Sequence, residues 1–210
     1  MSDGPSFEGY TVVSCGTLRR ELNHLRETGF LDADGVLYTV PGLHERIWEL
    51  EEQLRSRLAK ALERSPRALV VYGSRCYLRT QDERDVDEII DEVGGDVVRI
   101  DAKNCIDALA SYGDLKELAG EVEPYWLTPG WMDNWKLIFQ GWDHGLANET
   151  FPKHGRAALL DPFGVYEEYV ENKPEQLLEF SDWMGIPIEP VPVGLDRLKG
   201  LLADCVGRGT

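Results

Sequence analysis

The sequence predicts an α/β fold, a single domain with a mainly parallel, Rossmann-like sheet and helices on both faces. Short runs of β-branched residues alternate along the chain with longer segments of helical periodicity, which is the pattern of repeated strand–helix units. Residues 68–72 are apolar without alternation, as expected for a parallel strand that is buried on both faces. With 210 residues, 42% of them hydrophobic, the chain can form one substantial core.

The predicted strands recur at intervals that leave room for a helix between most of them. In chain order they are residues 10–15, 36–40, 68–72, 97–100, 125–128 and 186–193. Asp34-Gly35 marks the turn before the second strand. The last strand contains Pro187, Pro190 and Pro192, and because proline cannot donate a ladder hydrogen bond, this strand should lie at an edge.

The predicted helices are the segments in which apolar residues recur at three- and four-residue spacing. In chain order they are residues 17–28, 43–64, 85–93, 105–118, 131–146, 163–170, 175–184 and 195–205. The second helix carries the clearest apolar stripe and should end before Pro66. Gly29 and Gly94-Gly95 fit the ends of the first and third helices.

Composition and charge limit the cellular setting and the partners. Residues 10–205 are predicted to form one domain between flexible ends at 1–9 and 206–210, because no linker or repeat interrupts them. The 38 acidic and 22 basic residues give a net charge of −16, which argues against nucleic acid or an anionic membrane as a partner. The chain has neither a membrane-spanning apolar run nor signal-peptide features at its N-terminus, so we expect a cytoplasmic protein.

Three of the four cysteines follow predicted strands. Cys15 ends the first strand, Cys76 follows the third, and Cys105 follows the fourth. If these strands are parallel neighbours, the thiols meet at the sheet edge where α/β proteins bind ligands. Thiolates gathered there indicate a soft metal ion or an iron–sulfur cluster, although the long spacings lack the short pairs of a zinc ribbon or ferredoxin loop. The alternative is that each cysteine is a small buried hydrophobe, which is the expectation for Cys205 on the last helix.

Other side chains are candidates for the same site. His44, at the head of the long helix, would complete a tetrahedral zinc site with the three thiolates, unless it only caps the helix or faces solvent. Without His44, three thiolates could hold a four-iron cluster and leave one iron open. Tyr72, Arg75 and Trp131 are expected to form the cofactor or substrate pocket, with Arg75 as a clamp for an anion or carboxylate.

An aromatic segment follows the fifth strand. Trp131, Trp135 and Trp142 fall on one helix face, so they either pack onto the sheet or form an aromatic wall for a flat cofactor or an apolar substrate. The sequence has no glycine-rich dinucleotide loop, no phosphate-binding loop and no hydrolase nucleophile elbow. Nucleotide-motif enzymes and α/β-hydrolases therefore lose support.

Several short motifs occur in a recognisable order. They are a first strand ending in Cys15, Gly-Leu-His at His44, Tyr-Gly-x-x-Cys at Cys76, Asn-Cys-Ile at Cys105 and Thr-Pro-Gly-Trp at Trp131. Over roughly residues 10–205 this order resembles the family called domain of unknown function 1638. Genes of that family often lie near those of corrinoid proteins and corrinoid-dependent methyltransferases of anaerobes. The resemblance implies a metal-linked role in one-carbon metabolism, with Cys15, His44, Cys76 and Cys105 as the matching site residues.

Three functions remain open from the sequence. The first is a metalloprotein whose three cysteines hold an iron–sulfur cluster with an open iron, which transfers electrons or binds a small substrate. The second is a zinc-dependent methyl-transfer protein that uses the same cysteines with His44 or an external thiol. The third is a non-catalytic accessory protein for a corrinoid methyltransferase. The expected partners are a small-molecule substrate, a redox partner or a corrinoid protein, with no nucleic acid or membrane and with the oligomeric state left open.

Overall fold

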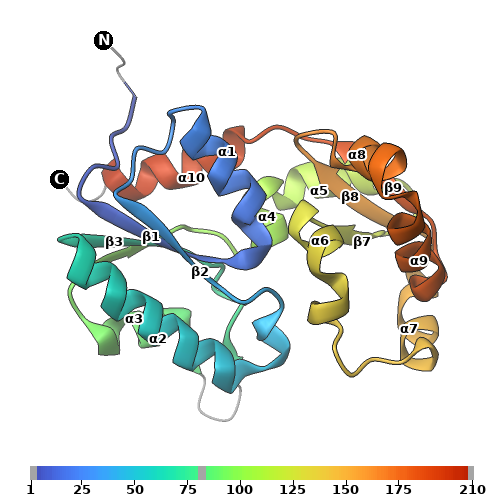
Figure 1. Ribbon diagram of the computed structural model, residues 1–210, viewed down its shortest axis with the longest axis horizontal. Coiled ribbons are helices and arrows are strands. Elements are labelled where there is room, and N and C mark those ends of the chain that lie inside the picture. Colours follow the sequence, from blue (N-terminus) through green and yellow to red (C-terminus); the bar gives the residue numbers. More distant parts are fainter. Residues whose placement is uncertain (1–3, 80–83, 208–210) are drawn as a thin grey trace.

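The computed structural model describes residues 4–79 and 84–207. It confirms the α/β class, with helices packed on parallel sheets (Figure 1). The parallel strands are divided between two sheets, whereas the sequence predicts one. The predicted flexible ends lie partly outside the described residues. Within the described residues, no helix has the length and apolar character needed to cross a membrane.

The first sheet is parallel throughout and has the strand order β2-β1-β3-β6. Its strands are β1 (Tyr10–Cys15), β2 (Gly35–Thr39), β3 (Arg67–Val71) and β6 (Asp96–Arg99). The helices that cover it are α1 (Arg19–Glu27), α2 (Ile47–Arg64), α3 (Val86–Val93) and α10 (Asp196–Gly207). Because successive side chains of a strand point to opposite faces, Val12 packs with α1 and α10 while Val13 packs with α2 and α3.

The second sheet is also parallel, in the order β7-β8-β9. Its strands are β7 (Tyr125–Leu127), β8 (Ala157–Asp161) and β9 (Ile188–Pro192). Its helices are α6 (Pro129–Ile138), α7 (His144–Thr150), α8 (Val165–Asn172) and α9 (Pro174–Met184). The edge position predicted for the proline-containing strand β9 is confirmed. Ala158 and Leu160 of β8 pack into the core under α1 and α10, so one apolar cluster joins the two sheets.

Three of the predicted helices are interrupted or divided in the structure. The segment 43–64 starts as a 3-10 turn, η2 (Leu43–Glu45), and becomes α2 only after Arg46, whose φ of −128° is not helical. The segment 105–118 divides into α4 (Cys105–Leu109) and α5 (Tyr112–Ala119), because Ala110 is extended and Ser111 caps the second helix. The segment 131–146 divides into α6 and α7, with Gly141 at a φ of 94° between them.

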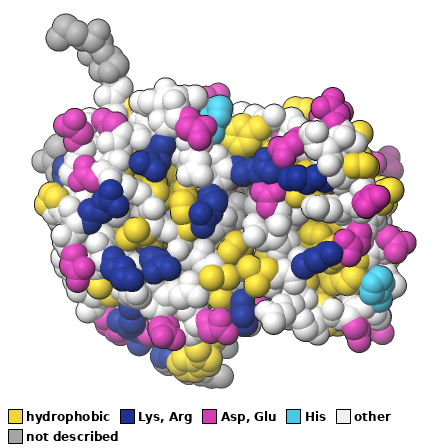
Figure 2. All heavy atoms as spheres, viewed as in Figure 1, with side chains coloured by type: hydrophobic (Ala, Val, Ile, Leu, Met, Phe, Trp, Pro, Cys, Tyr) yellow, Lys and Arg dark blue, Asp and Glu magenta, His cyan; other side chains and the backbone are white. Residues whose placement is uncertain are grey.

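Short elements complete the chain. They are η1 (Gly16–Leu18), η3 (Phe151–His154) and an antiparallel pair of two-residue strands, β4 (Leu78–Arg79) and β5 (Arg84–Asp85). These segments are too short to produce a periodic sequence signal. Figure 2 shows that on one face of the molecule the basic side chains are interspersed among the acidic ones.

The two halves are joined by an ion-pair network next to the chain segment that follows β1. The guanidinium of Arg20 on α1 donates to Asp133 of α6 at 2.6 and 2.8 Å and to Glu168 of α8 at 2.7 Å. The hydroxyl of Tyr169 donates to the same Asp133 carboxylate at 2.9 Å. These bonds to Asp133 and Glu168 raise the pKa of Arg20 above its ordinary value. Because the network ties α1 to α6, it fixes the position of the β7–α6 loop relative to β1.

Candidate functional site

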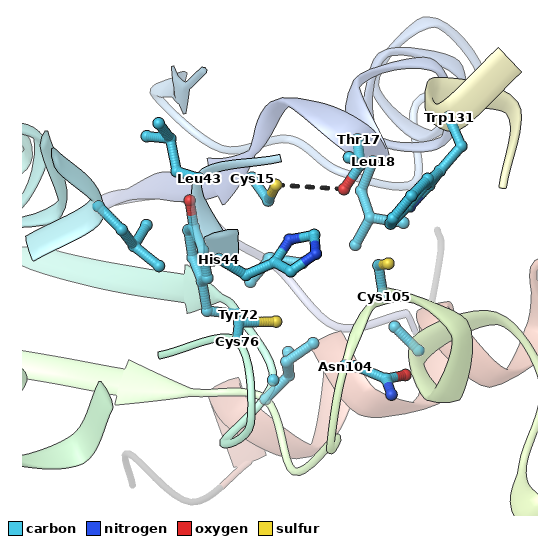
Figure 3. A pocket seen from close by; sticks show the side chains of 15 residues that line it. Cys15, Thr17, Leu18, Leu43, His44, Tyr72, Cys76, Asn104, Cys105 and Trp131 are labelled. Atoms are coloured by element: carbon cyan, nitrogen blue, oxygen red, sulfur yellow. Dashed lines mark hydrogen bonds between the residues drawn. The ribbon is translucent and has the colours of Figure 1, made fainter. Parts of the chain in front are cut away.

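Three thiols line one cavity at the carboxyl ends of β1, β3 and β6. Cys15 ends β1, Cys76 lies in the turn after β3, and Cys105 is the first residue of α4 after β6. Each residue is half-buried as a whole, and all three line the cavity (Figure 3). The structure therefore brings together the three cysteines that the sequence places at strand ends. Cys205 is buried in α10, in the core of the first sheet.

Backbone hydrogen bonds between two turns hold Cys76 and Cys105. The amide of Ser74 donates to the carbonyl of Ala102 at 2.9 Å, and that of Arg75 donates to the carbonyl of Lys103 at 2.9 Å. Gly73 is required for this approach, because a Cβ there would lie 2.3 Å from the backbone of Lys103. The turn after β3 and the turn before α4 thus form one rigid unit.

Asn104 sets the start of α4 and hence the position of Cys105. Its side-chain oxygen accepts a hydrogen bond from the amide of Asp107 at 2.9 Å, as an N-cap residue does. The carboxylate of Asp107 in turn accepts from the amide of Lys103 at 2.8 Å. Both bonds orient the peptide groups around Cys105.

The loop between β7 and α6 closes the cavity from the second half of the protein. A Cβ on Gly130 would lie only 2.1 Å from the carbonyl oxygen of Thr17, so only glycine lets the two backbones touch. The same Thr17 donates its hydroxyl hydrogen to Sγ of Cys15 at 3.1 Å. This contact places Trp131, which follows Gly130, in the cavity wall.

Burial and mutual proximity keep two of the thiols protonated in the absence of a cation. Burial, with a smaller contribution from the nearby Cys15, raises the pKa of the Cys105 thiol to about 12, although Trp131 and Thr17 act in the opposite direction. Burial also raises the pKa of Cys76, and the neighbouring Cys105 and Cys15 add to this effect. A cation bound between the sulfurs would reverse this balance, because it stabilises every thiolate that faces it.

Trp131 presents an unused hydrogen-bond donor to this site. The residue is 8% exposed, and among the described residues its Nε1–H has no acceptor in hydrogen-bond geometry. It lies close enough to Cys105 to favour the thiolate form of that side chain. A buried donor without an acceptor costs free energy, and a sulfur that carries more negative charge would satisfy it. The orphaned N–H therefore fits a thiolate-bound group.

His44 and Tyr72 also line the cavity. In Figure 3 the His44 ring extends into the space between the thiols. Its side chain is 37% exposed, with Nε2 3.6 Å from Oε1 of Glu45 and the ring 5.7 Å from that of Trp131. Burial lowers the pKa of His44, so the neutral imidazole that can bind a metal is favoured. Tyr72 is 3% exposed, its hydroxyl makes a short hydrogen bond with Thr39, and burial raises its pKa well above the ordinary value.

Arg75 and the other tryptophans lie elsewhere. Arg75 is exposed and faces a groove on the other side of the turn that carries Cys76, so it does not line the thiol cavity. Trp135 stacks on Phe180 at 4.8 Å and 9°, and Trp142 stacks on Phe151 at 5.9 Å and 24°. Of the predicted aromatic wall, only Trp131 reaches the cavity; the remainder packs in the core of the second sheet.

The geometry limits what the thiols can bind. Among residues 4–79 and 84–207, no three Cys, His, Asp or Glu side chains converge closely enough to hold a single metal ion. The cavity has a volume of about 30 Å³, which is room for one or two water molecules. The thiols share a cavity but are more widely spread than the ligands of one tetrahedral ion.

Glu21 carries a buried carboxyl group near the site that the sequence did not lead us to expect. It is fully buried on α1, and neither carboxylate oxygen has a hydrogen-bond partner among the described residues. Burial raises the pKa of Glu21 to about 8, and the negative charge of Glu21 contributes to the raised pKa of Cys105. The signal was present in the sequence, since Glu21 shares the helix face of Leu18 and Leu25 and is the charged residue on that apolar stripe.

Comparison with known proteins supports the family resemblance. Neither the curated proteins nor the solved structures include a match to this chain. The family model described as "Protein of unknown function (DUF1638)" matches residues 38–202, which include His44, Cys76, Cys105 and Trp131 but not Cys15. The match spans most of the chain, and the protein belongs to the DUF1638 family.

Proposed function

We propose that the protein holds an iron–sulfur cluster on Cys15, Cys76 and Cys105, with one iron open to a small-molecule ligand. The observation that carries the proposal is that thiols from the ends of three strands line one cavity. Cysteine thiolate is the usual ligand of such clusters. Positive iron would also offset the burial and mutual repulsion that raise the pKa values of Cys76 and Cys105.

The spread of the thiols supports a cluster over a single ion. One tetrahedral zinc holds every thiolate at about 2.3 Å from the same centre, and the described side chains do not converge in that way. A cluster offers a separate iron to each cysteine, so its ligands stand farther apart. A cluster needs more than the present 30 Å³, and rotation of the partly exposed His44 ring toward solvent would enlarge the space between the sulfurs.

The surrounding residues suit this role. The Thr17 hydroxyl donates to the Cys15 sulfur, and Trp131, whose N–H lacks an acceptor among the described residues, lies near Cys105, so both would stabilise negative charge on sulfur. Leucine, isoleucine and valine side chains that line the cavity exclude water: Leu18, Leu43, Leu50, Val71 and Ile100. When bound, the cluster would supply electron transfer or Lewis acidity at its open iron. The family resemblance supports a setting in anaerobic one-carbon or corrinoid metabolism, with a corrinoid protein or a small molecule as partner.

The position of His44 supports one alternative, a zinc-dependent methyl-transfer protein. Its ring extends between the thiols, and burial favours its neutral, metal-binding form. In this alternative the same cysteines close around one ion with His44 as a ligand, and the zinc would activate a thiol substrate.

Anaerobic reconstitution with iron and sulfide, followed by metal and sulfide analysis, tests the proposal. We expect about four iron and four sulfide per chain, as in a [4Fe–4S] cluster, with brown colour and visible absorbance. Replacing Cys15, Cys76 or Cys105 by serine should abolish cluster retention. The matched control is Cys205→Ser, which changes a cysteine outside the cavity and should retain the iron.

The His44→Ala variant distinguishes the iron–sulfur cluster from the zinc alternative. A cluster held by three cysteines should survive this change, whereas a zinc site that uses the imidazole should lose its metal. Colourless protein with about one zinc per chain, lost in His44→Ala, would replace the cluster proposal by the zinc alternative. If neither metal is retained and all three cysteine variants fold normally, both the cluster proposal and the zinc alternative are wrong. An accessory role for a corrinoid methyltransferase would then gain support.

A further inference from the structure

A second hollow lies on the other side of the turns that hold Cys76 and Cys105. This groove has a volume of about 340 Å³. Arg75, Lys103 and Lys116 contribute its positive charge, and Tyr112 and Trp126 contribute its aromatic surface. Asn104 lines both the groove and the thiol cavity, so the turn before α4 separates the two spaces.

The groove concentrates positive charge in a protein whose net charge is −16. Within the part of the chain that the structure describes, the side chains of Arg75, Lys103 and Lys116 form no ion pair. The two acidic residues of the groove already have other hydrogen-bonding partners. Asp107 pairs with Arg197 at 2.7 Å, and Glu123 accepts the indole N–H of Trp126 at 2.7 Å. The three cations are therefore available to an anionic ligand.

The spacing of the cations follows from the fold. The Arg75 amide donates to the Lys103 carbonyl at 2.9 Å, which places these two residues side by side. Lys116 comes from the next helix, α5, and completes the third side of the groove. The guanidinium of Arg75 can donate hydrogen bonds to two oxygens of one phosphate, and the ammonium groups of the two lysines add compact positive charges. This combination favours a phosphate as the ligand.

The aromatic side chains complete the arrangement. Tyr112 is 73% exposed at the start of α5 and lines the groove, so its ring is accessible to a ligand there. Trp126 is half-buried and oriented by its hydrogen bond to Glu123. Flat rings of a ligand stack on such side chains, whatever their hydrogen-bonding pattern.

We propose that this groove binds a phosphate ester with a planar ring, such as a nucleotide or flavin mononucleotide. The phosphate lies among Arg75, Lys103 and Lys116, and the ring lies against Tyr112 and Trp126. The site needs no glycine-rich loop, because side-chain cations take the place of backbone amides. Binding in the groove does not depend on a metal in the thiol cavity. A ligand in the groove would nevertheless contact Asn104, the residue next to Cys105.

Isothermal titration calorimetry on the full chain tests the proposal with ADP and flavin mononucleotide as probes. Adenosine, which lacks phosphate, and pyrophosphate, which lacks a ring, serve as the half-ligands. We expect ADP or flavin mononucleotide to bind at least about tenfold more tightly than either half-ligand, which corresponds to about 1.4 kcal/mol. Which of the two complete probes binds identifies the ring as purine or isoalloxazine.

Variants locate the binding at the groove. The double change Lys103→Ala and Lys116→Ala should weaken binding at least about tenfold, and Tyr112→Ala should weaken it about fivefold or more. Lys60→Ala removes an exposed lysine of α2 outside the groove and should leave the affinity unchanged. Cys15→Ser should also bind normally, which separates this site from the cluster proposal. The inference is overturned if neither probe binds, if the double variant binds as the wild type does, or if pyrophosphate binds as tightly as the complete probes.

Discussion

Replacing Glu21 by glutamine is expected to stabilise the apoprotein at neutral pH. The Glu21 carboxyl is fully buried without a hydrogen-bond partner among the described residues, and burial raises its pKa to about 8 from an ordinary value of 4.5. Between these two pH values the unfolded chain releases a proton that the folded chain keeps. Stability therefore falls as pH rises, by about 1.4 kcal/mol per pH unit, and levels off above the folded pKa.

Glutamine keeps the shape and polarity of the protonated acid but cannot ionise. We expect Glu21→Gln to match the wild type near pH 4.5, to exceed it by about 3 kcal/mol at pH 7, and to exceed it by about 5 kcal/mol above pH 8. Urea unfolding at a series of pH values measures the difference between the two proteins. Glu27→Gln, on the exposed side of α1, is the control and should change the curve little. A constant difference between Glu21→Gln and the wild type across this pH range would show that the carboxyl is ionised and paired in the folded protein.

Replacing Gly73 by alanine should destabilise the fold and disturb both candidate sites. The new Cβ would lie 2.3 Å from the backbone of Lys103 and Asn104, so the turn after β3 must move away from the turn before α4. Backbone atoms cannot yield as a side chain does, and we expect a loss of about 3 kcal/mol or more in unfolding free energy. The same movement should separate Cys76 from Cys105 and Arg75 from Lys103.

Thermal and urea unfolding measure the stability of Gly73→Ala, and metal retention and ADP or flavin mononucleotide binding report on its two sites. Gly200→Ala is the matched control, because that glycine lies within α10 and its Cβ would meet no described atom within 4 Å. Alanine there should stabilise by about 0.5–1 kcal/mol, since it restricts the unfolded chain. Equal stability of Gly73→Ala and the wild type would mean that the two turns do not form a rigid unit.

The meeting of the cysteines is predictable because it depends on local features of the sequence. Each thiol lies at or just after the end of an apolar strand, and parallel strands present their carboxyl ends at one sheet edge. The argument assumed that the three strands share one sheet, and the strand order β2-β1-β3-β6 confirms this assumption. The edge strand β9 is predictable for a similar reason, since proline lacks the N–H that an inner strand must donate.

Helix ends were less predictable, because competing interactions within a few residues decide them. Apolar spacing continues through Ala110, but the side chain of Ser111 caps a new helix and Ala110 is extended. Gly141 similarly interrupts a segment whose tryptophans keep helical spacing. In both cases the apolar periodicity records which face is buried and not where the backbone turns.

By itself, the sequence determined the α/β class, the strand ends that carry Cys15, Cys76 and Cys105, and the helical segments between them. Only the tertiary structure decided that β7, β8 and β9 form a sheet of their own, that Arg75 faces away from the thiols, and that Glu21 is buried without a partner. The physical reason is the range of the interactions. Strand and helix formation follow from the spacing of neighbouring residues, whereas sheet membership, the side of a turn that a side chain takes and the burial of a carboxyl depend on contacts between residues far apart in the chain.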